Sequence, residues 1–220
     1  CNVIMNESNA SKVNDGSLVD LHLQSVQKNQ CEIVKELIGE IHVLMSLGED
    51  AHSISLMTMI DIIKALGKLS RDNPLIRQEK QIDLSFVSWF ITLLTAKLPH
   101  IRITSSQIIG MLIGLKLLAH FKPDKGARYQ LYPFVEYIKN HLSEKVDDSN
   151  KDIIATISVL GVLAQRRLLV TTEKFELHQL LSNFRVSQCS DIFGCIDIIY
   201  GLGLMAGRNL LSPKVVENRF

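Results

Sequence analysis

The sequence predicts an all-α protein, an α-solenoid of stacked helix-turn-helix repeats with about four units of 42–49 residues. Three observations predict it: 46% of the 220 residues are apolar, only five are proline, and a short apolar motif recurs four times at helical spacing. Leu, Lys, Gln and Glu interrupt the β-branched residues, which favours helices over strands. A single helical hairpin cannot bury its apolar side alone, so we expect the hairpins to stack.

The recurring motif is a five-residue segment that begins with a leucine in every copy. The four leading leucines are 49, 45 and 42 residues apart. An Ile or Leu stands six and three residues before each of them, a Leu or Met three residues after, and a Ser or Ala four residues after. These steps trace one face of an α-helix, where the small residue lets a neighbouring helix approach closely. The leading leucines are Leu66, Leu115, Leu160 and Leu202.

A second apolar stripe follows each of the first three motifs and predicts the second helix of the hairpin. These stripes include Phe90, Ile138 and Leu181, which lie 24, 23 and 21 residues after the leading leucines of their units. Breakers such as Asn73-Pro74 separate the two helices of a unit. Polar residues near the starts of the first helices are expected N-caps. They are Ser53, Thr104, Ser149 and Ser190.

These signals divide the chain into a polar N-terminal arm and one repeat domain. Residues 1–16 are polar and lack periodicity, so we expect a mobile arm. Residues 17–220 form the repeat domain, which opens with a partial unit. Leu18 to Val26 weakly indicates the first helix of that unit, and Ile33 to Met45 indicates the second. The expected units are 17–48 (partial), 53–98, 102–146, 149–186 and 188–220 (incomplete).

Composition and motifs argue against several classes of protein. The 24 Lys and Arg against 23 Asp and Glu give a net charge of +1, so any contact with nucleic acid must come from a local basic patch. The longest apolar stretch, Ile108 to Phe121, contains Lys116 and is too short to span a membrane. The four cysteines form no C-x-x-C pair, and the chain has no phosphate loop, nucleophile elbow or zinc-protease motif. We therefore expect no enzyme activity, cofactor, metal or small-molecule substrate.

The first-helix segments carry a narrower resemblance. Asp152 to Ala164 and Ser190 to Ala206 start with polar residues and end in Leu-Gly-Val-Leu-Ala and Leu-Gly-Leu-Met-Ala. They resemble the octotricopeptide and heptatricopeptide repeats, the latter found in FAST-kinase-domain and RAP-domain proteins of mitochondria and plastids. The resemblance covers about residues 53 to 206. It departs from the family at the tryptophan of the first helix, because Trp89 lies in a second helix, and these 220 residues contain no RAP domain.

The resemblance implies RNA binding, RNA processing or a structural role in an organellar ribosome. We therefore expect a non-catalytic subunit of a ribonucleoprotein in the matrix of the mitochondrion or of another organelle. Its expected partners are rRNA or another organellar RNA and other protein subunits of a large complex. One alternative is a HEAT- or armadillo-like protein–protein scaffold of a large organellar complex. Another is an RNA-processing factor whose catalytic domain lies outside this chain.

Basic side chains gather near the ends of the predicted first helices and are the candidate RNA-binding residues. If these helix ends share one surface, their charges form a stripe that follows a phosphate backbone. Lys and Arg are also favoured in the last turn of any helix, because they complement its macrodipole. Lys125, Arg128 and Lys139 would extend the stripe. The candidates are Lys64, Lys68, Arg71, Lys116, His120, Lys122, Arg166, Arg167 and Arg208.

Overall fold

The computed structural model describes residues 15–46, 53–73, 84–119, 127–143, 145–172, 174–186 and 192–212. Within these ranges the regular structure is helical, and the β-type pairs are isolated bridges, so the predicted all-α class is confirmed. A short 3-10 helix, Leu98–His100, follows α4. The α-helices are α1 (Asp15–Ser46), α2 (Ser53–Asp72), α4 (Ser85–Lys97), α5 (Ser105–Leu118), α6 (Tyr132–Asn140), α7 (Val146–Gln165), α8 (His178–Ser182) and α9 (Ile192–Ala206).

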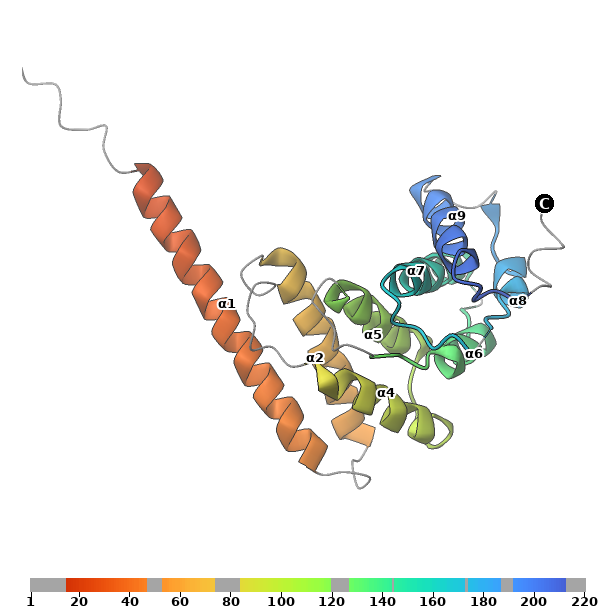
Figure 1. Cartoon of the computed structure of the whole chain (residues 1–220), viewed down its shortest axis with the longest axis horizontal. Helices are drawn as coiled ribbons and strands as arrows, with labels where there is room; N and C mark the ends of the chain where they lie inside the picture. The colour runs from red at the N-terminus through yellow and green to blue at the C-terminus, as the bar shows by residue number, and fades with distance from the viewer. Residues whose placement is uncertain are drawn as a thin grey trace, which may run out of the picture.

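Four of the helices, α2, α5, α7 and α9, lie next to one another in chain order (Figure 1). Each of them contains one copy of the repeated motif. The shorter helices α4, α6 and α8 connect them and form a second row (Figure 1). The long helix α1 packs against α2 at the beginning of the first row. Successive copies of the motif therefore lie side by side in space.

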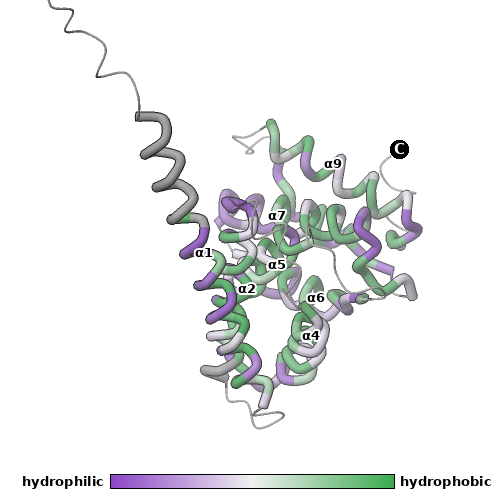
Figure 2. Tube along the Cα trace, turned by 60° about the vertical axis from the view of Figure 1, so that its left-hand side comes forward, coloured by the Kyte–Doolittle hydropathy of each residue, from purple (hydrophilic) through white to green (hydrophobic). Residues whose placement is uncertain are grey.

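The repeated motif supplies the core in the units that begin with α2, α5 and α7. The leading leucines of these units, and the residues three positions before them, are each at most 2% exposed. One hydrophobic cluster joins them to side chains of the second row. Figure 2 shows hydrophobic segments of α2, α5 and α7 gathered at the centre of the molecule. The six buried residues are Ile63, Leu66, Leu112, Leu115, Ile157 and Leu160.

In α9 the first half of the motif is exposed. Ile196 and Ile199, which the periodicity predicts as core, are 54% and 71% exposed, and Leu202 is half-buried. The prediction is wrong for these two isoleucines because α9 packs on α7 through another side, where Ile198 and Gly201 are buried together with Met205, the last apolar residue of the motif. Among the described residues, no helix covers the outer side of α9. The periodicity identifies an apolar face but does not say whether a neighbour is present.

The N-terminal segment forms one helix where the sequence indicates a pair. Helix α1 runs for 32 residues without a break, because residues 26–33 contain no Gly or Pro, and half of them are the good helix formers Gln, Lys and Glu. It packs on α2 and contributes Val34 and Ile41 to the buried core. The side-chain amide of Asn73 also donates to Oε1 of Gln30 at 3.1 Å. Residues 15 and 16 of the expected arm are the first of α1, and its other residues lie outside the described ranges.

The predicted helix starts are confirmed at one position and wrong at another. Thr104 caps α5, since its hydroxyl accepts from the N–H of Gln107 at 3.2 Å and its own N–H donates to the Gln107 side chain at 2.9 Å. Ser149 is buried inside α7, which begins three residues earlier at Val146. Ser53 is the first residue of α2, and residue 190 lies outside the described ranges.

Candidate nucleic-acid interface

Helices α7 and α9 end with the same backbone geometry. Arg167 and Asn209 each lie seven residues after a leading leucine and have positive φ values of 60° and 55°. A left-handed residue at this position ends a helix and lets the next N–H bond back to a late helical carbonyl. The place usually belongs to Gly or Asn, and an arginine there costs about 1 kcal/mol. The two returning bonds are Leu168 N–H to Leu163 O (2.9 Å) and Leu210 N–H to Met205 O (3.0 Å).

Parallel bridges then connect each of these helix ends to the preceding unit. Leu169 bridges to Tyr129, and Leu211 bridges to Phe175. Leu169 and Leu211 both lie nine residues after a leading leucine. The N–H of Tyr129 donates to the carbonyl of Leu168 at 2.6 Å, and the N–H of Phe175 to that of Leu210 at 2.8 Å. Backbone hydrogen bonds therefore join the segments that follow α5, α7 and α9, beyond the C-terminal ends of these helices.

Three arginines from these segments line an open hollow of 380 Å³, named here the arginine hollow. Arg128 directly precedes the bridging Tyr129, Arg167 follows the C-cap residue of α7, and Arg208 follows α9. All three side chains are exposed. The remaining lining residues include no Asp or Glu, and no described carboxylate forms an ion pair with Arg167 or Arg208. The other lining residues are Ala164, Leu169, Thr171 and Leu210.

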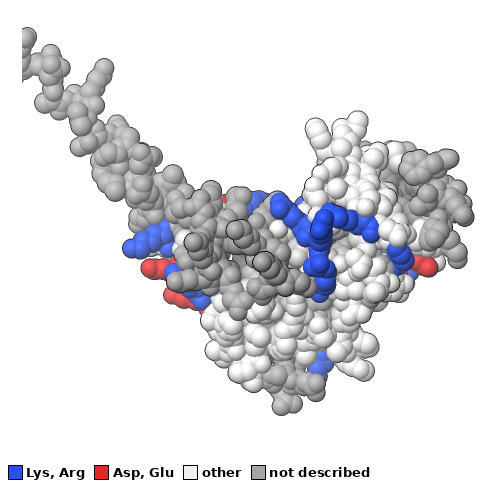
Figure 3. All heavy atoms as spheres, in the orientation of Figure 1, with Lys and Arg blue, Asp and Glu red and all other residues white. Residues whose placement is uncertain are grey.

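Positive side chains also gather on the surface near the C-terminal ends of these helices. Figure 3 shows Lys and Arg side chains in a strip across the face on which α5 and α7 lie. In the same view, acidic side chains are seen near α1 and at the opposite edge, away from the strip. A concave surface lined by charges of one sign raises the local potential and attracts anions. The chain thus has a local basic patch even though its net charge is only +1.

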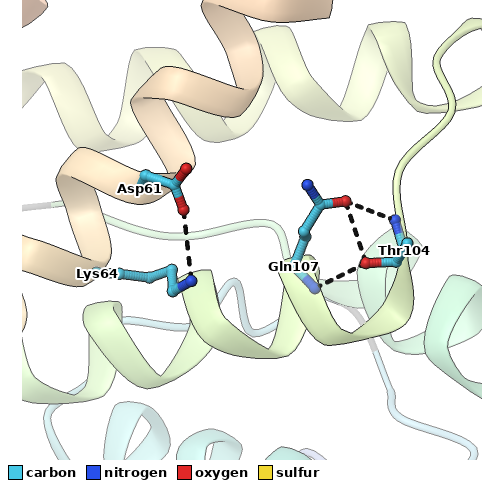
Figure 4. Close-up of polar contacts among 4 residues, drawn as sticks. All are labelled: Asp61, Lys64, Thr104 and Gln107. Carbon is cyan, nitrogen blue, oxygen red and sulfur yellow. Dashed lines mark hydrogen bonds and ion pairs between the residues drawn. The ribbon is translucent and has the colours of Figure 1, made fainter.

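The candidates on α2 are exposed, but two of them have acidic neighbours. The ammonium of Lys64 lies 3.4 Å from Asp61, and Figure 4 shows this pair beside the capping box of α5. The stem of Lys64 also covers Gly110 of α5, where a Cβ atom would lie 2.8 Å from Lys64 Cε. Arg71 bonds to Asp72 at 2.7 Å, which raises the pKa of Arg71 and lowers that of Asp72. Lys68 is exposed but is not part of the arginine hollow.

Lys116 connects two helices. It is half-buried, and its ammonium donates to the hydroxyl of Ser158 at 2.7 Å, so that it ties α5 to α7. Lys139 also has a partner within the fold, because it forms an ion pair with Glu136 on α6. Neither ammonium points to a role in binding a ligand.

Arg166 and Arg208 occupy equivalent positions, six residues after their leading leucines, but only Arg208 lines the arginine hollow. His120 and Lys122, together with Lys125, lie outside the described residues. Of the nine candidates, the structure brings Arg167 and Arg208 together. It adds Arg128, which the sequence indicates only as an extension of the stripe.

Other kinds of site find no support in the described ranges. Within them, no group of three or more His, Cys, Asp or Glu side chains is placed to hold a metal ion. The described helices include none with the length and apolar character needed to cross a bilayer. No family model, curated protein or solved structure matches the chain.

Proposed function

We propose that this chain is a non-catalytic α-solenoid that binds RNA through the arginine hollow, as a subunit of an organellar ribonucleoprotein in the mitochondrial matrix. The observation that carries the proposal is the convergence of Arg128, Arg167 and Arg208 from three successive units on one hollow without acidic lining. A guanidinium donates two parallel hydrogen bonds to a phosphate, which makes arginine well suited to this contact. The organellar location rests on the resemblance of the motif to octotricopeptide and heptatricopeptide repeats.

The backbone of Arg167 supports a functional role for its side chain. Its left-handed conformation would suit Gly, and the equivalent position in the next unit is Asn209. An arginine held in an unfavourable conformation is the kind of local strain that gathers at functional sites. The guanidinium lies at the edge of the hollow despite this cost.

The solenoid arrangement is part of the proposal. Helices α2, α5, α7 and α9 follow one another in a row, and the ends of α7 and α9 repeat the same hydrogen bonds and bridges at the same positions. A solenoid places equivalent residues of successive units along one edge. The arginine hollow would then be one stretch of a longer edge that follows an RNA backbone.

The chemistry of the hollow indicates how RNA would be recognised. Three guanidiniums contact phosphates, and phosphate contacts position a nucleic acid without reading its sequence. No aromatic side chain is among the lining residues, so the hollow itself offers no stacking platform for bases. We therefore expect binding that tolerates different sequences and weakens steeply with salt.

A protein–protein scaffold of the HEAT or armadillo type is the second candidate, and one observation favours it. The outer side of α9 exposes five large hydrophobic residues, whereas monomeric proteins rarely expose an apolar patch of this kind without a partner. This surface and the arginine hollow involve different side chains, so one chain can use both. The five are Ile192, Phe193, Ile196, Ile199 and Tyr200.

Fluorescence anisotropy with a labelled single-stranded RNA of about 16 nucleotides tests the proposal. The triple variant Arg128→Gln, Arg167→Gly, Arg208→Gln removes three phosphate contacts. Its affinity should therefore fall less steeply with salt, the slope of log K against log salt being smaller by about 2. Between 50 and 200 mM salt the wild-type chain should consequently lose about 20-fold more affinity than the variant.

A control variant removes the same number of charges elsewhere. Lys145→Gln and Lys151→Gln lie at the other end of α7, about 33 and about 24 Å from Arg167 along the helix, and Lys28→Gln lies on α1. This variant should keep most of the wild-type salt slope. Equal losses in the two triple variants would show that only net charge matters, and the arginine hollow would then not be the RNA site.

A further inference from the structure

Glycines allow the closest contacts between helices of the first row. A Cβ atom on Gly67 of α2 would lie 2.7 Å from the carbonyl oxygen of Gly114 in α5. One on Gly161 of α7 would lie 2.5 Å from Cα of Gly201 in α9. No side chain fits at such distances, so the two backbones touch. In each pair the first glycine directly follows a leading leucine and the second directly precedes the next one.

An isoleucine completes each crossing. A Cβ atom on Gly114 would lie 2.7 Å from the carbonyl oxygen of Ile63, and one on Gly201 would lie 2.6 Å from that of Ile157. Each isoleucine stands four residues before the first glycine of its pair, so the two share one helix face. This Ile-Gly surface receives the glycine of the following helix.

Helix α9 carries a third Ile-Gly surface, made by Ile199 and Gly203 at the same spacing. In contrast to its two counterparts, this one is open: Ile199 is 71% exposed, and a Cβ atom on Gly203 would meet no heavy atom of the described residues within 4 Å. Ile192 and Tyr200 beside it are 71% and 57% exposed. Figure 2 shows α9 as a largely hydrophobic helix at the outer edge of the molecule. The described part of the chain supplies no helix for this surface.

The exposed face of α9 is complementary to itself. Ile192, Ile196, Ile199, Gly203 and Ala206 follow one another at steps of four and three residues, which forms one stripe along the helix. The stripe is bulky in its N-terminal half and flat in its C-terminal half. When two copies of α9 cross antiparallel about their centres, Ile196 of one copy lies opposite Gly203 of the other. Each bulky half then fills the flat half of the other copy.

We infer that α9 is a dimerisation helix, which packs antiparallel on α9 of a second copy of this chain. The contact has two-fold symmetry, because the same face serves both copies. As in the pairs α2–α5 and α7–α9, a glycine lets the neighbouring helix come close, but here Gly203 would face Ile196 of the second copy, because Gly201 already packs on α7. The helix contains one charged residue, Asp197, in keeping with the scarcity of charge in interface cores.

The size of the face sets the expected affinity. The five exposed large residues would bury at most roughly 600 Å² per copy, below the ~800 Å² per partner of a standard stable interface. The dissociation constant of the dimer should therefore be in the micromolar range, about 1 to 100 µM.

Sedimentation velocity of the full chain without RNA, from about 1 to 200 µM, tests the inference. The wild-type chain should pass from monomer to dimer. Gly203→Leu inserts a side chain where Ile196 of the other copy would lie, so the dissociation constant should rise at least about tenfold. The monomer has room for this side chain, and Leu favours the helix more than Gly does, so the variant should fold.

A matched control and a rescue separate this contact from general hydrophobic association. Gly39→Leu places the same side chain at another open helical glycine, on α1, and should leave the dissociation constant unchanged. Adding Ile196→Ala to Gly203→Leu exchanges the large and the small residue. The dissociation constant should then return to within about threefold of the wild-type value. A chain that stays monomeric at the highest concentration, a Gly203→Leu variant that associates as tightly as the wild-type chain, or a failed rescue would overturn the antiparallel dimer.

Discussion

The contact between α7 and α9 makes a sharp prediction about stability. Gly161 and Gly203 stand at the same position of the repeated motif, directly after a leading leucine, and both lie in helices. Gly161 faces Gly201, whereas Gly203 faces open space. Replacement by alanine therefore makes the same chemical change in two opposite surroundings. It should lower the free energy of unfolding at position 161 and raise it at position 203.

The magnitude follows from the distances. A Cβ atom at position 161 would lie 2.5 Å from Gly201 Cα, and ordinary contact begins at 3.4 Å, so the helices must separate by about 0.9 Å. Overpacking of this kind costs about 3 kcal/mol when backbone cannot yield, and alanine regains about 1 kcal/mol of helix propensity. Gly161→Ala should thus lower the free energy of unfolding by about 2 kcal/mol. Gly203→Ala, without the clash, should raise it by about 1 kcal/mol.

Urea denaturation followed by circular dichroism measures both effects, at a protein concentration well below the dissociation constant of the proposed dimer. The slope of the free energy against urea should be unchanged, so that the midpoints report stability directly. In thermal unfolding, Tm should shift by roughly 2–4 °C per kcal/mol, so the Tm values of the two variants should differ by about 6–12 °C. If Gly161→Ala proved as stable as Gly203→Ala, the close crossing of α7 and α9 would be wrong, and with it the equivalence on which the dimer rests.

Three further predictions concern single residues. Arg167→Gly should raise stability by about 1 kcal/mol, measured by urea denaturation, because Gly adopts the left-handed conformation without strain; a loss of stability would contradict that backbone geometry. Thr104→Ala should lower it by about 1 kcal/mol, since α5 loses its cap, while Thr104→Ser should remain close to wild type. Burial raises the pKa of Asp152 above its value in the unfolded chain, and the negative charge of Asp148 raises it further. The protonated carboxyl therefore stabilises the fold at a pH below the unfolded pKa. This stability is lost as the pH rises through the folded pKa. Asp152→Asn should therefore be more stable than wild type at pH 7 and equal to it near pH 3, and an unchanged difference across that range would contradict the assignment.

The core could be predicted because the helical period is a local property of the sequence. Ile63 and Ile157 are buried as the motif indicates, since a neighbouring helix covers each of them. Ile199 has the same sequence signal and is exposed. Burial depends on the presence of a neighbour, which a period of three and four residues does not encode.

The arginine hollow could be predicted only in part. The basic helix ends identify Arg167 and Arg208, but Lys116 has the same signal and instead bonds to Ser158 on the next helix. Arg128 lies between helices and reaches the hollow because Tyr129 bridges to Leu169, a contact between residues 40 positions apart. Pairing over such a distance depends on the packed units and leaves no local pattern.

The two proposed surfaces bear on one another through α9. Arg208 follows the C-terminal end of this helix, and the proposed crossing is antiparallel, so the two hollows of a dimer would lie at opposite ends of the helix pair. Fifteen residues of helix extend about 22 Å, which sets the approximate distance between the hollows. An RNA long enough to reach both would bind a dimer with added avidity, whereas a monomer offers a single hollow. A dimer would therefore bind a longer RNA strand more tightly than a monomer, even though each hollow contacts phosphates weakly and tolerates different sequences.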